Sequence, residues 1–201
     1  MKAYEIINYL ENYFPLELQM DFDCCGLQIG NRNKEIKKVY IALNADNETL
    51  QACIEQDCQM LITHHPFLLE KIKNMDVNEH QGYFISLAMR HDIVVYSLHT
   101  CLDRGKNGIS MNDWLVNQLG VHGIECYDHY EVGKKAILNQ PMEGNTFIKY
   151  RHAKYAIDHD CLLIDPGHHL EVIFEKELQK LLDNLPIDTQ IHESKDYFNY
   201  E

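Results

Sequence analysis

The chain has 201 residues, of which 45% are hydrophobic and 24% are charged, and its formal net charge at pH 7 is −13. These values are typical of a globular protein with enough residues for a large core. The negative charge argues against a protein that wraps nucleic acid or lies on an anionic membrane, because both tasks favour a basic face. No apolar run approaches the length that spans a membrane, so we expect no membrane contact.

Cysteine usage and the N-terminal sequence indicate a reducing compartment. The seven cysteines are an odd number and include no Cys-x-x-Cys pair, so a zinc ribbon or a thioredoxin-like site is a poor interpretation. Residues 1–5 lack the apolar segment of an export signal. We therefore expect a cytoplasmic protein whose thiols are reduced.

The first 120 residues alternate between helical and extended patterns. In chain order, the patterns predict a helix over 2–13, strands over 25–30 and 38–43, a helix over 47–56, a strand over 60–63, a helix over 81–90, a strand over 92–98 and a helix over 112–119. Asp46 or Asn47 is the candidate N-cap of the second helix. Strands that alternate with helices predict an α/β fold with a mostly parallel, helix-covered sheet.

The rest of the chain has a less regular pattern. It predicts a strand over 132–138, a helix over 150–157, a strand over 161–164, a helix over 171–182 and a last strand after Pro186. No repeat, low-complexity tract or long linker divides the sequence.

Three clusters of histidine and acidic residues follow predicted strands. They are Thr63-His64-His65-Pro66-Phe67, His99-Thr100-Cys101-Leu102-Asp103 and Gly167-His168-His169-Leu170-Glu171. The carboxyl ends of parallel strands meet at one edge of a sheet, where α/β proteins bind ligands. Mixed imidazole and carboxylate ligands suit Zn²⁺, Fe²⁺, Mn²⁺ or Ni²⁺. The clusters therefore predict a metal site, and a bridging carboxylate would let it hold two ions about 3.5–4 Å apart.

Some members of these clusters allow a second interpretation. His99 precedes Asp103 by four residues, and we expect it to orient that carboxylate rather than bind metal itself. His168 and His169 compete for one role. Cys101 could be a nucleophile, but a small buried apolar residue is the favoured interpretation.

Residues outside the clusters have weaker signals. Asp21-Phe22-Asp23 could close a metal pocket, or its carboxylates could be solvated in a turn. Gly26 and Gly30 match no phosphate-binding fingerprint, so we expect them to serve turns. Six histidines are assigned no role in the site: His80, His91, His122, His129, His159 and His192.

Four segments of the chain resemble motifs of the Nif3-like proteins named GTP cyclohydrolase 1 type 2 homolog. They are Gly26-Leu27-Gln28-Ile29-Gly30, the first cluster, the second cluster with Gly108 and Asn112-Asp113 after it, and Ile164-Asp165-Pro166-Gly167-His168 with an acid after it. They occur in the family's order. The family's counterpart of the second cluster reads His-Thr-Asn-Leu-Asp, so Cys101 stands where the family has asparagine.

The resemblance implies a dinuclear metal centre. It implies five ligands for two divalent ions: His64, His65, Asp103, His168 and Glu171. Asp103 and Glu171 would be the bridging carboxylates. Three further histidines would be supporting residues or alternative ligands: His99, His152 and His169. The family places its glutamate four residues after the histidine of the Gly-His motif, whereas Glu171 follows His168 by three.

The resemblance also implies a domain organisation. We expect a single Nif3-like domain over 1–201 with two similar lobes, a motif lobe over 1–125 and a C-terminal lobe over 126–201. A strand and helix that the family usually has are missing between Lys134 and Thr146, so the second lobe is reduced. The family assembles as a toroidal hexamer, and we expect a homohexamer.

Two functions of different classes follow from these observations. The first is a metal-dependent hydrolase that acts on an unknown small molecule; the cyclohydrolase name is a family label, and no pattern in the sequence indicates a guanine or ribose site. The alternative is a non-enzymatic regulator or metal-handling protein. The two differ in whether the metal keeps an open coordination position for a substrate.

Overall fold

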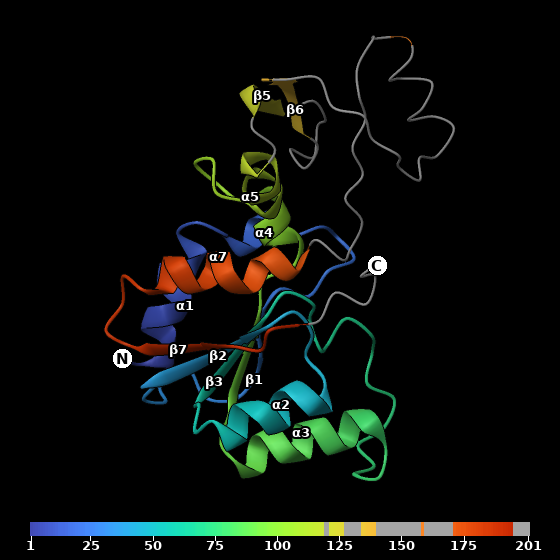
Figure 1. Ribbon diagram of the computed structural model, residues 1–201. Coiled ribbons are helices and arrows are strands. Elements are labelled where there is room, and N and C mark those ends of the chain that lie inside the picture. Colours follow the sequence, from blue (N-terminus) through green and yellow to red (C-terminus); the bar gives the residue numbers. More distant parts are fainter. Residues whose placement is uncertain (119–120, 127–133, 140–157, 159–170, 195–201) are drawn as a thin grey trace, which may run out of the picture.

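The computed structural model describes residues 1–118, 121–126, 134–139, 158 and 171–194. Its main feature is a five-stranded sheet with the strand order β1-β4-β3-β2-β7 (Figure 1). The strands are β1 (Gly26–Ile29), β2 (Lys38–Ala42), β3 (Met60–Thr63), β4 (Val94–Ser97) and β7 (Asp188–Ile191). All neighbours pair in parallel except β1, which is antiparallel to β4. The predicted α/β fold with a mostly parallel sheet is therefore confirmed.

Helices cover both faces of this sheet (Figure 1). One face carries η1 (Leu16–Leu18), α1 (Ala3–Glu11), α4 (Thr100–Arg104), α5 (Met111–Asn117) and α7 (Ile173–Leu182). The other face carries α2 (Asn47–Glu55) and α3 (His80–Arg90). A separate antiparallel pair is formed by β5 (Val121–Cys126) and β6 (Lys134–Leu138). Among the described helices, none combines the length and apolar character that crossing a bilayer requires.

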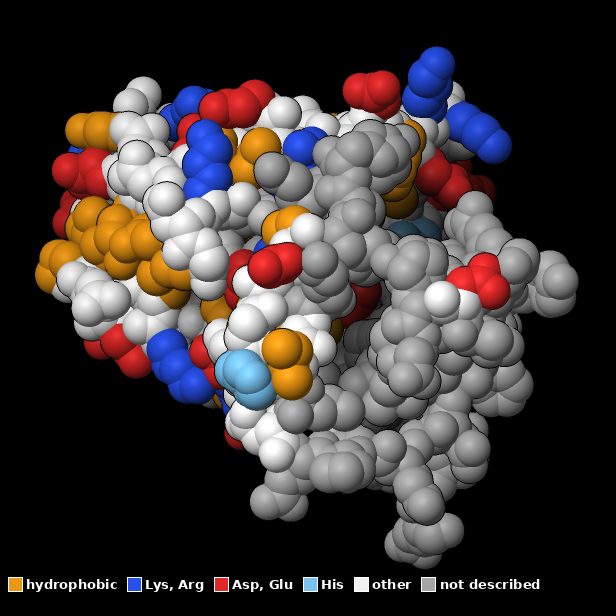
Figure 2. Space-filling view, turned by 90° about the horizontal axis from the view of Figure 1, so that it is seen from above, with side chains coloured by type: hydrophobic (Ala, Val, Ile, Leu, Met, Phe, Trp, Pro, Cys, Tyr) orange, Lys and Arg blue, Asp and Glu red, His pale blue; other side chains and the backbone are white. Residues whose placement is uncertain are grey.

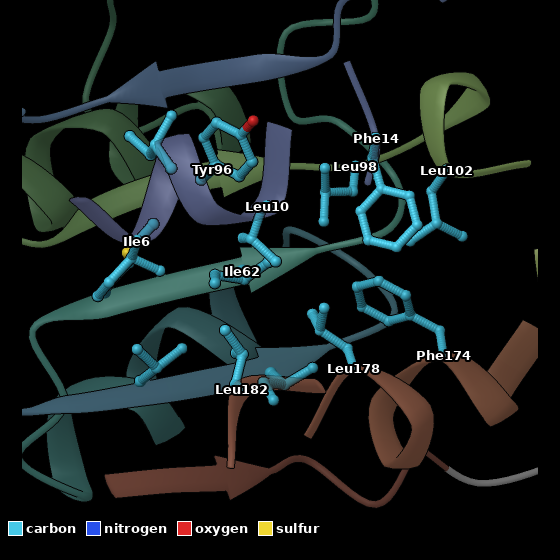
Figure 3. Packing of buried hydrophobic residues seen from close by; sticks show 14 of the residues in the cluster. Ile6, Leu10, Phe14, Ile62, Tyr96, Leu98, Leu102, Phe174, Leu178 and Leu182 are labelled. Carbon is cyan, nitrogen blue, oxygen red and sulfur yellow. The ribbon is translucent and has the colours of Figure 1, made fainter. Parts of the chain in front are cut away.

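The central strands are buried on both faces because each face has its own layer of helices. Val39 and Ile41 of β2 belong to the core cluster on the α1 and α7 face, whereas Tyr40 between them belongs to the α2 and α3 face. Figure 3 shows the first cluster, in which Leu178 from α7 and Ile62 from β3 converge. The continuous apolar runs of the sequence are the signature of this two-sided burial.

The predicted elements agree with the observed ones over the described residues. Their bounds differ by at most two residues at each end, the usual uncertainty of a pattern. Three elements were not predicted: η1, α4 and β5. α4 has five residues, which is too short to show a helical period. The predicted helix over 150–157 and strand over 161–164 lie outside the described residues.

α7 and β7 lie beyond residue 125 in sequence but belong to the main sheet. β7 pairs with β2, and α7 contributes Phe174, Leu178 and Leu182 to the core on the α1 face. The division into two lobes near residue 125 stays a prediction. For the site, the consequence is that the start of α7 lies near the ends of the central strands.

The N-cap of α2 provides a test of helix stability. Asp46 Oδ1 accepts a hydrogen bond from the backbone N–H of Thr49 at 2.9 Å, and Thr49 Oγ1 accepts one from the N–H of Asp46. We expect Asp46→Ala to lower the free energy of unfolding by about 1 kcal/mol, because the cap is lost. Glu55→Ala, at the exposed end of the same helix, should change it by less than about 0.5 kcal/mol in urea denaturation. Equal losses in the two variants would contradict the capping role.

Candidate metal centre

The candidate site lies at the carboxyl ends of β2, β3 and β4. Asn44 follows β2, His64 and His65 follow β3, and His99 follows β4 as the N-cap of α4. These strands are parallel neighbours, so their ends meet at one edge of the sheet. β1 runs antiparallel to β4, and Asp23, which precedes β1, therefore reaches the same edge.

Three histidines form a compact group at this edge. The ligand nitrogens of His64, His65 and His99 all lie within 4.8 Å of one another. The ring of His64 is 4.9 Å from that of His65 and 5.2 Å from that of His99, measured between ring centroids. Zinc–nitrogen bonds of about 2.1 Å put two ligands of one ion at most about 4.2 Å apart. A small inward movement of the rings therefore lets all three bind one ion.

His64 is held in the form that binds metal. Its Nδ1 donates a hydrogen bond to the carbonyl oxygen of Leu98 at 2.8 Å, and a carbonyl only accepts, so Nε2 keeps its lone pair. The side chain is 1% exposed, and the ring of Phe174 packs 5.6 Å away. Burial lowers the pKa of His64 to about 3, with a contribution from the neighbouring His65. The ring is therefore neutral near pH 7, with Nε2 available to a cation.

Asp23 orients the imidazole ring of His99. Its Oδ1 accepts a hydrogen bond from His99 Nδ1 at 2.9 Å, which leaves the Nε2 of that ring for the site. Its Oδ2 accepts from the backbone N–H of Thr100 at 2.9 Å, from the Thr100 hydroxyl and from the Cys25 thiol. Burial alone would raise the pKa of Asp23, but the hydrogen bonds outweigh burial and hold this pKa well below its usual range. Asp23 is therefore an ionised carboxylate that fixes one imidazole.

The location of Asp23 decides between two interpretations of the sequence. The side chain of Asp23 is fully buried, so the interpretation of a solvated turn carboxylate is wrong for this residue. Asp21, two residues earlier, is exposed and fits that interpretation. The Asp23 carboxylate thus lies in the site, whereas the Asp21 carboxylate is solvated.

His65 contacts residues from two distant parts of the sequence. Its Nδ1 is 2.7 Å from Asn44 Oδ1, and its Nε2 is 3.1 Å from Glu171 Oε2. Glu171 lies two residues before α7. Because α7 packs on the sheet next to β2, a carboxylate from the C-terminal part of the sequence reaches the end of β3. The off-register spacing of Glu171 does not keep it from the histidines.

Asp103 lies in α4, and its carboxylate faces His64. Its Oδ1 is 3.8 Å from His64 Nε2. Burial raises the pKa of Asp103 to about 7 against the opposing effect of His99, and repulsion from Glu171 and Asp23 contributes to the rise. A carboxylate in this position is poorly compensated by the protein's own charges, so a cation between Asp103 and the imidazoles would be stabilised.

The structure brings together most of the predicted site residues. His64, His65, Asp103 and Glu171 lie at one edge of the sheet, and His99, which we expected to orient Asp103, belongs to the group of three histidines. Three other predicted residues lie outside the described residues: His152, His168 and His169. The assignment of individual ligands stays a prediction.

The residues assigned no role have other environments. His80, His91 and His122 are exposed, and His192 forms a hydrogen bond with the hydroxyl of Tyr40. Two others lie outside the described part of the chain: His129 and His159. Cys101 is fully buried, as the apolar interpretation predicts.

Comparisons with known proteins connect this geometry to one family. The family model described as DUF34/NIF3 (NGG1p interacting factor 3) matches residues 1–159. A Clostridium acetobutylicum protein named GTP cyclohydrolase 1 type 2 homolog is 37% identical over 120 residues, which cover 60% of this chain and 44% of that protein. A Campylobacter jejuni protein of the same name is 27% identical over an alignment that covers the whole of both chains. The chain thus spans less than half of the first relative and all of the second.

A solved structure agrees with the sequence comparisons on the fold. A Staphylococcus aureus hypothetical protein has a TM-score of 0.77 and 19% sequence identity, and the match covers 100% of this chain and 99% of that one. At this identity the likeness shows the fold alone.

Proposed function

The chain belongs to the DUF34/NIF3 family, and on that premise we propose that it is a divalent-metal-binding protein whose site is centred on His64, His65 and His99. The group of three converging imidazoles supports the proposal, because mixed imidazole and carboxylate surroundings suit Zn²⁺, Fe²⁺, Mn²⁺ or Ni²⁺. Each ring also has a hydrogen-bond partner at Nδ1, which is how metal-binding histidines are usually oriented.

The observation that carries the proposal is the pair formed by His64 and Asp103. His64 Nδ1 donates its proton to the carbonyl oxygen of Leu98, so His64 Nε2 is an acceptor. This Nε2 atom is 3.8 Å from Asp103 Oδ1. Above the pKa of Asp103, about 7, the two facing atoms are both acceptors with no proton between them. A metal cation resolves this conflict, because both atoms are lone-pair donors to it. The residues present therefore fit a divalent ion.

The finer proposal is a dinuclear centre with hydrolase chemistry. The ligands would be His64, His65, Asp103, His168 and Glu171, with Asp103 and Glu171 as bridging carboxylates. A divalent ion at this site supplies Lewis-acid chemistry, the type that metal-assisted hydrolysis uses. In this arrangement, the protein's own residues fix the ring orientations through Leu98 and Asp23 and exclude water behind His64 with Phe174. The substrate would be a small molecule of unknown identity.

The alternative proposal is a metal-binding regulator or metal-handling protein. The burial of His64 favours this alternative, because a closed site resists exchange of ligands. The partial exposure of His65 and Glu171 favours the hydrolase, because a metal held there would keep a coordination position open to a substrate.

The remaining parts of the proposal concern location and assembly. We include a cytoplasmic location, a single Nif3-like domain with a reduced second lobe, and a homohexamer. Exposed apolar side chains in the segment between β3 and α3 support self-association: Leu69, Ile72, Met75 and Val77. On the face seen in Figure 2, acidic and basic side chains are interspersed over the described surface, and this mixture does not resemble the basic stripe of a nucleic-acid-binding face.

Elemental analysis with a hydrolase panel tests the proposal. We expect purified wild-type protein, grown in metal-replete medium, to hold about two divalent ions per chain. His65→Ala should lose most of this metal because a central ligand is removed. If the protein is a hydrolase, the same variant should lose activity toward one of the phosphoesters, nucleotides or cyclic amides in the panel.

His91→Ala is the control, because His91 is exposed and lies on α3's C-cap away from the site. It should keep the wild-type metal content and activity. Stoichiometric metal without activity on any panel member would favour the regulator. Wild-type protein without metal would refute the metal site itself.

A further inference from the structure

Two cysteines lie close to the pair formed by His99 and Asp23. Cys25 directly precedes β1, and Cys101 lies in α4 directly after Thr100, whose backbone N–H donates to the same Asp23 oxygen as the Cys25 thiol. The two segments are held together because Gly26 of β1 pairs with Ser97 of β4, shortly before α4 begins. The thiols are therefore neighbours through the fold, although they are far apart in the sequence.

This thiol pair is connected to the metal site by hydrogen bonds. Cys25 Sγ donates to Asp23 Oδ2 at 3.2 Å, and Asp23 Oδ1 accepts from His99 Nδ1. Thr100, the neighbour of Cys101, donates to the same carboxylate. A change in either sulfur therefore acts on the carboxylate that orients His99.

We propose that Cys25 and Cys101 form a reversible oxidation site for peroxides, and that their disulfide weakens metal binding at the histidine group. The disulfide itself follows from the position of the two thiols. Its effect on metal rests on the proposed function. Cys101 stands where the family motif has asparagine, so the pair is a property of this chain rather than of that motif.

The reaction consumes one peroxide and forms one disulfide. Cys25 is partly exposed, whereas Cys101 is fully buried, so Cys25 meets hydrogen peroxide first. Its sulfur attacks one peroxide oxygen, the O–O bond breaks, and Cys25 becomes a sulfenic acid while the other oxygen leaves as water with the thiol proton. The sulfur of Cys101 then attacks the sulfenic sulfur, and the S–O bond breaks as the S–S bond forms. A second water leaves with the remaining thiol proton.

The disulfide changes both supports of the Asp23 carboxylate. Cys25 no longer has the proton that it donates to Asp23. An S–S bond is about 2.05 Å long, so its formation draws Cys101 of α4 and Cys25 before β1 together. That helix begins with Thr100 directly after His99. Loss of the group that orients a metal-binding histidine typically lowers metal affinity about 10–100-fold.

A second thiol pair in the same chain provides an internal control. Cys53 of α2 and Cys58 before β3 are also close together, because the backbone N–H of Cys58 donates to the carbonyl oxygen of Cys53 at 3.0 Å. Both are buried in the core on the α2 and α3 face, opposite to α4 and α7. The pair therefore has the same chemistry as Cys25 and Cys101 but not their connection to Asp23.

The test uses full-length reduced protein loaded with Zn²⁺, which is redox-inert. The protein is treated with stoichiometric hydrogen peroxide, free thiols are blocked with N-ethylmaleimide, and disulfides are mapped by mass spectrometry of peptides. Zn²⁺ affinity is measured before oxidation, after oxidation and after reduction with dithiothreitol. We expect a Cys25–Cys101 cross-link, Zn²⁺ binding weakened about tenfold or more, and recovery on reduction.

Two variants sharpen the result. In Cys101→Ala the cross-link should be absent, and a sulfenic acid on Cys25 should be trapped by dimedone. Cys58→Ala should respond to peroxide as the wild type does. Cross-links through other cysteines in place of Cys25–Cys101, or a Cys25–Cys101 cross-link that leaves Zn²⁺ affinity unchanged, overturn the proposal. If the reduced protein binds no divalent metal, the proposed function fails, while the peptide map still tests the oxidation site.

Discussion

Asp23→Asn is expected to lower the affinity for divalent metal about 10–100-fold, although Asp23 is not a predicted ligand. The carboxylate accepts hydrogen bonds on both oxygens, from His99 on one side and from Thr100 and Cys25 on the other. Asparagine has one oxygen and one NH2 group, so one set of donors would face another donor. The ring of His99 then loses its fixed orientation, or Thr100 loses its partner.

The measurement is a Zn²⁺ titration by calorimetry with a competing chelator. Asp21→Asn makes the same chemical change in the same turn, but Asp21 is exposed, and its affinity should match that of the wild type. Unfolding of the metal-free proteins is measured separately, and we expect Asp23→Asn to lose about 1–3 kcal/mol because a buried network is broken. If the two variants have the same Zn²⁺ affinity, Asp23 does not position the site.

The sequence predicts the edge of the sheet where the site lies, because local patterns determine that edge. Apolar runs identify β3 and β4, and the polar residues that follow them are His64, His65 and His99. Parallel pairing is a consequence of the alternation with helices, and it brings the strand ends together without further information. These three predicted site residues could therefore be located from periodicity and spacing.

The supporting contacts are not predictable in the same way, because they join segments that are distant in the sequence. Asn44 has no signal beyond its place after β2, and its contact with His65 depends on the register of β2 and β3. Asp23 precedes an antiparallel strand, and only the pairing of β1 with β4 brings it to His99. The burial that separates Asp23 from Asp21 likewise arises from packing and not from composition.

Phe174→Ala is expected to lower the free energy of unfolding by about 3–5 kcal/mol, the range for a fully buried phenylalanine. Phe174 lies at the start of α7, where Figure 3 shows it among Phe14, Leu102 and Leu178. Its ring also packs against His64. The same substitution should therefore affect both the core and the orientation of a metal ligand.

Leu178→Ala separates the two effects. Leu178 is one turn further along α7, is equally buried, and should cost about 2–5 kcal/mol in urea denaturation with chelator present. Its place in the core is one turn further from the start of α7, where Phe174 packs against His64. We therefore expect normal Zn²⁺ affinity in Leu178→Ala and reduced affinity in Phe174→Ala, measured under conditions where both variants are folded.

Metal-dependent stability gives an independent measurement of this coupling. A ligand that binds only the folded state stabilises it by about 4 kcal/mol at a thousand times its Kd, and a rise in Kd reduces this gain. Addition of Zn²⁺ should therefore stabilise Leu178→Ala as much as the wild type, and Phe174→Ala less. Equal gains in both variants would mean that Phe174 serves the core alone and that the orientation of His64 is set by its hydrogen bond to Leu98.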